Sequence, residues 1–279
     1  MPRPLSRWIA LSVRLGLIIM GACAASVLGL VIFRALAPSE TLRAASSEIG
    51  NYLQTLGAIY AVLLAFVVVI VWNQFNEARG LIEREASALV DLHRTASGLP
   101  PETRAQIQDG LVKYVDAVLA DEWRAMHTGN EAVIETVGHR LDDVWLAVHR
   151  CRPADSCQHT VYGEVLSHFN ELADLRTSRL SAARARVPTS MRILLYTGAV
   201  LMTGSIYLVY IPELWLHALI TASLAGAICH ILYLIVDLDD AFEGDSQISR
   251  AAFERARASF VRVSHLVGEE DLRERGVAR

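Results

Sequence analysis

The residues best suited to bind a metal lie in one short segment near the middle of the chain. Two thiols and two imidazoles could complete a tetrahedral zinc site, and they come from His149, Cys151, Cys157 and His159. Five residues separate the cysteines, more than the two to four usual in such sites. A disulfide is the alternative, although the cytoplasm keeps thiols reduced. We expect unpaired thiols in a loop over 150–157, with no metal or cofactor.

Polar side chains at helical spacing also occur inside a long apolar stretch near the C-terminus. Ser223, His230, Tyr233 and Asp237 share one face of a helix. An ionisable group at membrane depth often marks a functional path, whereas a histidine can equally hydrogen-bond a neighbouring helix as packing. Both interpretations stay open. His217, by contrast, is expected to lie near the membrane surface.

An acidic run follows that apolar stretch directly. Its carboxylates, on Asp239, Asp240 and Glu243, could bind a hard cation through their oxygens. Their spacing does not match the twelve-residue loop that binds calcium. The alternative is a solvated turn in which Phe242 packs onto the rest of the protein.

A stripe of apolar side chains that ends in two asparagines occupies one face of another long apolar stretch. Its members are Val62, Phe66, Val69, Asn73 and Asn76. Such a stripe could form the hydrophobic constriction of an ion pore with a polar inner mouth. From the residues alone, lipid contact or helix packing is favoured. Nowhere do a nucleophile, a base and an oxyanion-stabilising group converge, so we do not expect an enzyme.

The elements that position these groups are four stretches almost free of charge. The chain has 279 residues, of which 53% are hydrophobic and 20% charged, against about 45–50% and about 25% in soluble proteins. Each stretch reaches the ~20 residues that a helix needs to cross a bilayer. We predict an all-α protein with transmembrane helices over 15–33, 52–72, 193–211 and 214–236. The first should be a retained anchor, because its apolar region exceeds that of a signal peptide.

Arginines near the predicted spans favour one orientation. Twelve lie on the side of the termini and the middle segment, and only Arg34 and Arg43 lie on the other side. Basic residues concentrate on the cytoplasmic side. We therefore predict an inner-membrane protein of a bacterium with both termini in the cytoplasm. Residues 1–72 would supply two spans and a short periplasmic loop, 73–191 a helical cytoplasmic domain, 192–236 two more spans, and 237–279 a cytoplasmic C-terminal segment. The net charge of −4 argues against a nucleic-acid partner.

Local signals divide the middle segment into helices. The second span has no breaker after it and should continue as a helix to about Gly98. Pro101 can start the next helix, because its missing N–H is not needed in a first turn. Gly129 should end that helix, and Asn130 should cap the one that follows. After the cysteine loop, a last helix leads to Pro188.

The segment from Gly57 to Trp123 resembles a bacterial membrane family of unknown function that is described as bestrophin-like. The similar residues are Tyr60 to Phe66, Glu83-Arg84-Glu85-Ala86, the Leu99-Pro100 turn, Tyr114 and Glu122-Trp123. A second block is similar to the family's Asp-x-Pro-Phe-x-Gly signature. Asp239, Phe242 and Gly244 match it, and Ala241 stands where the signature has proline.

Bestrophins are pentameric anion channels with four spans per subunit and a helical cytoplasmic domain. The resemblance implies that second-span helices line a pore, with Phe66 and Val69 in its neck. It also nominates Asp239, Asp240 and Glu243 as an acidic segment like the one that takes part in calcium sensing in animal members. We therefore predict a homo-oligomeric channel in the lipid bilayer that passes small ions, with anions favoured. The alternative is a non-conducting, membrane-anchored interaction or sensory module that uses its cytoplasmic helices.

Overall fold

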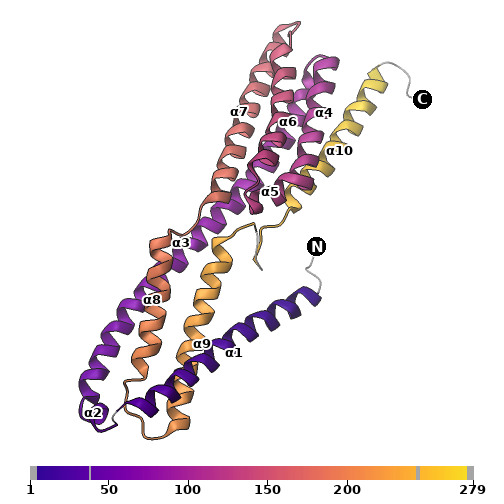
Figure 1. Cartoon of the computed structure of the whole chain (residues 1–279). Helices are drawn as coiled ribbons and strands as arrows, with labels where there is room; N and C mark the ends of the chain where they lie inside the picture. Colours follow the sequence, from indigo (N-terminus) through magenta and orange to yellow (C-terminus); the bar gives the residue numbers. More distant parts are fainter. Residues whose placement is uncertain (1–4, 38, 243–245, 275–279) are drawn as a thin grey trace. The chain divides into compact units, whose positions relative to one another are not determined.

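The computed structural model describes residues 5–37, 39–242 and 246–274 (Figure 1), and these contain helices and connecting turns but no β-strand. The predicted all-α class is confirmed. Contacts within the chain divide it into two compact units. Unit 1 comprises Met1–Asn73 and Arg186–Asp240, and unit 2 comprises Gln74–Ala185 and Ala241–Arg279.

Unit 1 contains the most apolar helices. They are α1 (Leu5–Leu36), the short α2 (Ser39–Ala44), the first half of α3 (Ser46–Thr95), α8 (Thr189–Ile206) and α9 (Leu214–Asp239). Three of them, α1, α3 and α9, are long and apolar enough to cross a membrane. In their most apolar stretches only 11%, 22% and 22% of the residues are buried within the chain. Apolar surface on this scale needs lipid or another protein surface to cover it.

The helix α8 is shorter than the predicted span over 193–211. It ends at Ile206, so its 18 residues rise about 27 Å. The N–H groups of Tyr207, Leu208 and Val209 each bond the carbonyl three residues back, which tightens the chain into a turn. Pro212 follows closely and disfavours helix in the residue before it. The prediction of helix over 207–211 is therefore wrong.

Glycines allow close approach between helices of unit 1. A Cβ added to Gly198 of α8 would lie 2.4 Å from the ring of Tyr60 on α3, so only glycine fits there without a shift of the ring. The Tyr60 hydroxyl donates to the carbonyl of Leu195 at 2.9 Å. In the same way a Cβ on Gly29 of α1 would lie 2.7 Å from the hydroxyl of Tyr207. These contacts join α3 to α8, and α1 to the turn after α8.

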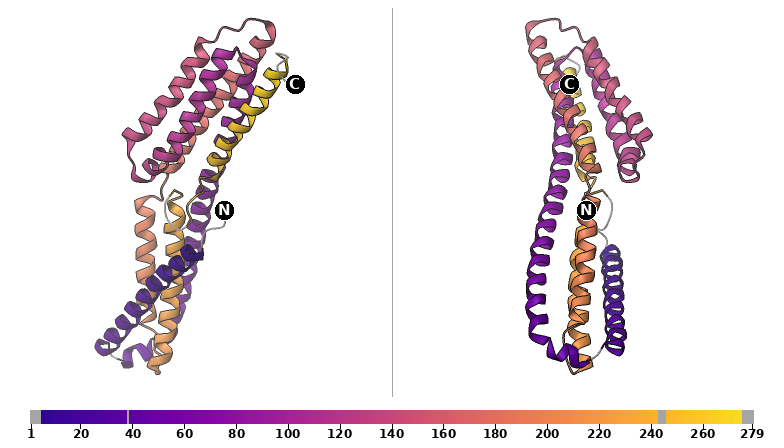
Figure 2. Two further views of the ribbon diagram at one scale, coloured as in Figure 1. Left: turned by 90° about the vertical axis from the view of Figure 1, so that its right-hand side faces the viewer. Right: turned by 60° about the vertical axis from the view of Figure 1, so that its left-hand side comes forward.

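Unit 2 is a helical bundle that contains the second half of α3. Its other elements are the 3-10 turn η1 (Ala96–Gly98), α4 (Pro101–Ala117), the π-helical turn η2 (Val118–Glu122), α5 (Trp123–Thr128), α6 (Glu131–Arg150), α7 (Ser156–Arg184) and α10 (Ala251–Glu274). In Figures 1 and 2 the helices α4, α6, α7 and α10 lie side by side with this part of α3.

Most of the predicted helix boundaries in unit 2 are confirmed. The helix α3 continues to Thr95 and η1 extends it to Gly98, after which Pro101 begins α4. Gly129 ends α5 with φ +65°, a left-handed conformation that glycine adopts at little cost. The side chain of Asn130 accepts a hydrogen bond from the Val133 N–H at 3.4 Å and caps α6. These signals act over a few residues, which is why the sequence reveals them.

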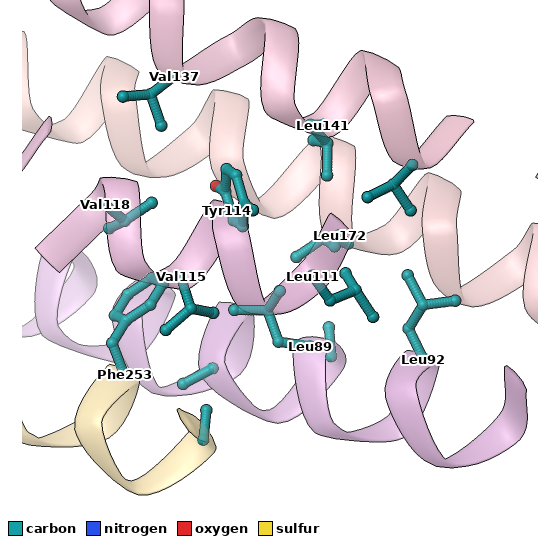
Figure 3. Packing of buried hydrophobic residues seen from close by; sticks show 14 of the residues in the cluster. Leu89, Leu92, Leu111, Tyr114, Val115, Val118, Val137, Leu141, Leu172 and Phe253 are labelled. Atoms are coloured by element: carbon teal, nitrogen blue, oxygen red, sulfur yellow. The ribbon is translucent and has the colours of Figure 1, made fainter. Parts of the chain in front are cut away.

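The core of unit 2 is drawn from every long helix of the bundle (Figure 3). Fully buried members are Leu89 and Leu92 of α3, Leu111 and Val115 of α4, Leu172 of α7, and Phe253 of α10. Phe260 of α10 is also buried. The C-terminal helix is therefore part of this core, a packing role that its sequence alone did not indicate.

Candidate functional site

The predicted pore-lining residues lie on an exposed face of α3. Val62, Phe66 and Val69 are 70%, 68% and 56% exposed in the single chain, and Asn73 and Asn76 are exposed as well. The opposite face of the same helix is buried through Tyr60, Leu64, Val67 and Val71. The first half of α3 thus packs against the rest of the chain on one side and presents the predicted stripe on the other.

Unit 2 buries an ionic cluster at the centre of its bundle. The guanidinium of Arg179 on α7 donates from Nε to Glu85 Oε2 at 2.5 Å and from Nη2 to Glu122 Oε2 at 2.7 Å. Its Nη1 lies 2.9 Å from Met126 Sδ. The Tyr114 hydroxyl donates to Glu85 Oε1 at 2.7 Å. Arg179, Glu85, Glu122 and Tyr114 are all fully buried, so four elements of the bundle, α3, α4, η2 and α7, meet at one set of hydrogen bonds.

A second arginine balances the charge of this cluster. Arg176 of α7 bonds Glu122 Oε1 and donates to the carbonyl of Ile134 at 2.9 Å. Two carboxylates and two guanidinium groups therefore face one another. A buried charge is tolerated when it is paired and hydrogen-bonded, and removing one partner of such a set is strongly destabilising.

The cluster keeps Tyr114 and Arg179 each in one protonation state. Burial, and next the Glu85 carboxylate, raise the pKa of Tyr114 well above its ordinary value, so the phenol stays neutral and donates. Burial by itself would lower the pKa of Arg179, but the Glu85 and Glu122 carboxylates and Tyr114 hold that pKa well above its usual range. The guanidinium therefore stays charged at physiological pH.

The π-helical turn η2 connects the cluster to an aromatic group. Glu122 is its last residue, and the N–H of Trp123 bonds the Val118 carbonyl five residues back. The Trp123 ring packs edge-on against Phe242 and Phe253, with centroids 5.6 and 6.2 Å away. The two sequence blocks that carry the resemblance, around Trp123 and around Phe242, are thus in contact. Phe242 packs onto the bundle, as one of the two interpretations of the acidic run expected.

The described carboxylates of the acidic run bond to the connection between α7 and α8. Asp239 Oδ1 accepts the Val187 N–H at 2.7 Å, and Asp240 pairs with Arg186 at 3.0 Å. Glu243 and Gly244 lie outside the described residues. Among the residues that the structure describes, no three His, Cys, Asp or Glu side chains gather as metal ligands would. A cation site in this run stays a prediction.

The predicted polar face of α9 differs from the face that packs within the subunit. Ser223 is exposed and donates to the carbonyl of Leu219 one turn back, and His230 is exposed. Tyr233 and Asp237 are half-buried. The face that is buried within the chain contains His217, Thr221, Ala225, Ile228 and Ile235. Polar groups are therefore present on both faces of α9.

The predicted thiol loop lies between α6 and α7, over residues 151–155. Cys151 is buried in the core and Cys157 is exposed on the first turn of α7, and both thiols are free. His149 and His159 are exposed. The structure therefore places one of the four groups in the core and three on the surface.

The ionic cluster is the feature that sequence reasoning missed, although a signal for it was present. Arg179 is one of the twelve arginines that favour the predicted orientation. Yet Arg179 lies at helical spacing on the same face as the apolar residues Leu172 and Ala183. In the same way, Glu85 lies on the same face as Ile82 and Leu89. A charged residue in the apolar register of a helix needs a partner of opposite charge. Two such residues of opposite sign on two helices would have indicated the pair.

Comparison with known proteins identifies solved structures with a similar fold. The chain is similar to a bacterial bestrophin homologue from Klebsiella pneumoniae whose crystal structure was phased with zinc: the identity is 17%, the TM-score 0.68, and the match covers 88% of this chain and 98% of that one. Two mutants of the bacterial bestrophin homologue from that organism match at 16% identity with TM-scores of 0.68 and 0.66, covering 88% and 92% of this chain and 98% and 99% of theirs. No curated protein sequence matches significantly.

These structural matches show the fold. The sequence itself matches the family profile described as the Bestrophin-like domain over residues 20–253. That range includes the exposed stripe of α3, all members of the ionic cluster, and both Trp123 and Phe242. The chain therefore belongs to the Bestrophin-like family.

Proposed function

We propose that the chain is one subunit of a homo-oligomeric ion channel in a bacterial inner membrane, with the first half of α3 lining the pore. The observation that carries the proposal is the exposed stripe of Val62, Phe66 and Val69, followed by Asn73 and Asn76, in a member of the Bestrophin-like family. The helices α1, α3, α8 and α9 would be the four spans. Unit 2 would lie in the cytoplasm, and five copies would surround one axis.

The chemistry of the stripe suits a gated pore. Rings of Val62, Phe66 and Val69 from several copies would make a hydrophobic constriction, which closes by losing its water. Thr55 and Asn51 continue the same face towards the start of α3. From the start of α3 onwards, this face is thus polar, then apolar, then polar again. That order would suit a hydrophobic constriction between two water-filled ends of a pore.

Small residues beside the stripe support packing around an axis. Ala58, Ala61 and Ala65 are exposed and lie along one side of it. Small side chains let membrane helices approach closely, so an α3 helix of a neighbouring copy could pack there. That contact would bring the α3 helices together at the centre of the assembly.

The neutral wall of the proposed pore does not repel anions. The helix α3 has no charged residue between Glu48 and Glu77, so no carboxylate on this helix faces the stripe to repel an anion. The amide groups of Asn73 and Asn76 can donate hydrogen bonds and would replace part of the hydration shell of an anion at the inner mouth.

Ion flux from liposomes tests the proposal. Purified oligomers should carry chloride faster than empty liposomes, and Phe66→Ala should raise the flux several-fold because it widens the constriction. Leu219→Ala is the matched control, since Leu219 is 57% exposed but lies on α9; this variant should leave the flux unchanged. Oligomers of verified size that carry no flux would contradict the proposal and favour the interaction module instead.

A further inference from the structure

Three helices of unit 1, α1, α8 and α9, border an apolar pocket. Both α1 and α8 pack against α9, and the pocket lies between the three with a volume of about 590 Å³. Figure 1 shows α8 and α9 side by side and α1 crossing α9. Every described residue that lines the pocket is uncharged, and the small side chains of Ala22, Ala25, Ala199 and Ala225 leave the space. Pockets that bind organic ligands measure about 300–1,000 Å³.

The shape of the pocket suits a long, thin occupant. Along α9 it extends from Ala225 to Val236, a rise of about 16 Å, and one leaflet of the hydrocarbon core is about 15 Å thick. A partner helix of that length, about 10–12 Å in diameter, would need roughly 1,300–1,800 Å³. The pocket is therefore too small for a helix, whereas the acyl chain of a lipid is thinner.

The pocket opens on the surface of the apolar helices. Its lining residues Ile18, Val200 and Val236 are exposed. Since α1 and α9 are long and apolar enough to cross a membrane, lipid tails would surround this opening. The hydroxyl groups of Ser26 and Tyr207, which also line the pocket, donate to the carbonyls of Cys23 and Ser26 at 2.8 Å each. An apolar occupant would leave both of these hydrogen bonds intact.

Two arginines lie beside one end of the pocket. On α8 the first lining residue is Tyr196, and Arg192 precedes it by one turn on the same face. On α1 the first lining residue is Ile18, and Arg14 precedes it by one turn. In Figure 1, α1 and α8 run in one direction and α9 in the opposite one, so Val236 lies at this end too. Both arginines are exposed, and neither guanidinium bonds a described residue.

The charge at this end of the pocket is positive. One carboxylate of α9, that of Asp237, lies just beyond the lining and is half-buried. Those of Asp239 and Asp240 bond to the connection between α7 and α8. The helix α8 begins at Thr189 without a side-chain cap, so the positive end of its dipole lies here as well. Together with the two guanidinium groups, it favours an anionic group.

We propose that the pocket holds one acyl chain of an anionic phospholipid, with the phosphate beside Arg192 and Arg14. The chain would cover the apolar lining, and the guanidinium groups would donate to the phosphate oxygens, as basic side chains at a membrane surface attract anionic lipids. The lipid would thereby connect α1 to α8. The site lies within one chain and does not depend on the proposed pore, so lipid binding and ion flux can be measured separately.

Native mass spectrometry of the full-length protein tests the preference for an anionic lipid. Delipidated oligomers should retain one dioleoyl phosphatidylglycerol per subunit in preference to dioleoyl phosphatidylcholine, which has the same chains and no net charge. Each guanidinium that contacts the phosphate should contribute roughly five-fold, so Arg192→Gln should lower the preference by that factor. Arg43→Gln, at an exposed arginine of α2, should keep it. Equal retention of the two lipids, or an unchanged preference in Arg192→Gln, would overturn the proposal.

A substitution that fills the pocket tests the place of the acyl chain. Ala199→Phe adds a ring within the lining and should lower the retention of both lipids several-fold. Ala24→Phe is the matched control, because Ala24 is exposed on α1 and does not line the pocket. Equal retention by the two variants would place the lipid elsewhere and contradict the proposal. If Ala199→Phe does not fold, Arg192→Gln still decides, since its side chain is exposed.

The structure of the oligomer in phosphatidylglycerol nanodiscs would locate the lipid directly. We expect density for an acyl chain between α1 and α8, with the phosphate beside Arg192. A pocket without such density, or one filled by side chains of a neighbouring copy, would overturn the proposal.

Discussion

Both halves of α3 depart from the usual relation between polarity and burial: the first exposes large apolar side chains, and the second buries a charged one. In the first half, Phe66 and Val69 are 68% and 56% exposed. In the second half, within the same continuous helix, Glu85 is fully buried and Leu89 packs beside it. Water outside a protein favours polar surfaces and apolar interiors. The first half therefore presents apolar surface that needs lipid or another protein surface to cover it, and the second half contributes to a buried set of paired charges.

This comparison shows that exposure has a different meaning in each unit. In unit 2, which the proposed function places in the cytoplasm, an exposed residue would contact water, and the buried Glu85 is paired with Arg179 and Tyr114. In unit 1 an exposed apolar residue needs lipid or another protein surface to cover it. Substitutions in the two halves should consequently affect different properties, stability in one and ion flux in the other.

The largest effect is expected at the ionic cluster. Glu85→Ala leaves the buried Arg179 with only part of its acceptors and should lower the free energy of unfolding by about 3–5 kcal/mol, measured by denaturant titration of the full-length protein in detergent. Glu83→Ala is the matched control, because Glu83 pairs with Arg255 at the surface and exposed pairs contribute little. The double variant Glu85→Leu with Arg179→Leu should recover part of the loss. Equal effects of Glu85→Ala and Glu83→Ala would contradict the cluster's role.

A direct comparison of the two halves comes from one truncation in each. Leu89→Ala removes a fully buried side chain and should cost about 2–5 kcal/mol. Phe66→Ala removes a larger side chain that makes little contact within its own subunit, so the stability of the protein should change little while ion flux rises. If Phe66→Ala destabilised the protein as much as Leu89→Ala, the exposed stripe would be a packing surface within the assembly instead of a pore wall.

A smaller effect is expected where α3 contacts α8. Gly198→Ala should force the Tyr60 ring to move, since the added Cβ would lie 2.4 Å from it, and should cost about 1–3 kcal/mol. Gly204→Ala on the same helix is the control, because nothing lies within 4 Å of its added Cβ. It should be neutral or slightly stabilising, as alanine favours helix over glycine. Both can be compared by thermal unfolding in detergent.

The smallest expected effect is a dependence of stability on pH in unit 2. His93 is buried and stacks on Phe260 of α10 with ring centroids 4.4 Å apart, and burial lowers its pKa to about 4 from an ordinary 6.5. Between these values the unfolded chain binds a proton that the folded one does not, so stability falls as the pH is lowered from about 6.5 towards 4. His93→Leu should flatten the Tm profile in this range. His139→Leu, at an exposed histidine, should leave the profile unchanged.

Much of the helical architecture could be predicted because its signals are local. Pro101, Gly129 and Asn130 mark helix ends through conformations and hydrogen bonds that involve only neighbouring residues. The end of α8 was misplaced because residues 207–211 are as apolar as a span. Hydropathy does not record the turn that Tyr207 and Pro212 make.

The candidate sites also differ in whether a local sequence pattern reveals them. Periodicity alone identified the stripe of α3, since a helical face can be read from spacing. It did not identify the ionic cluster, because Glu85, Glu122 and Arg179 lie in segments that are far apart in the chain.

The sequence by itself determined the helical class, most helix boundaries in unit 2 and the apolar stretches, because caps, breakers and hydropathy act over a few neighbouring residues. Only the tertiary structure decided which charges are buried and with which partners. Arg179 meets Glu85 across 94 positions of the chain, and the free energy of such a pair depends on desolvation and on contacts that no local pattern encodes.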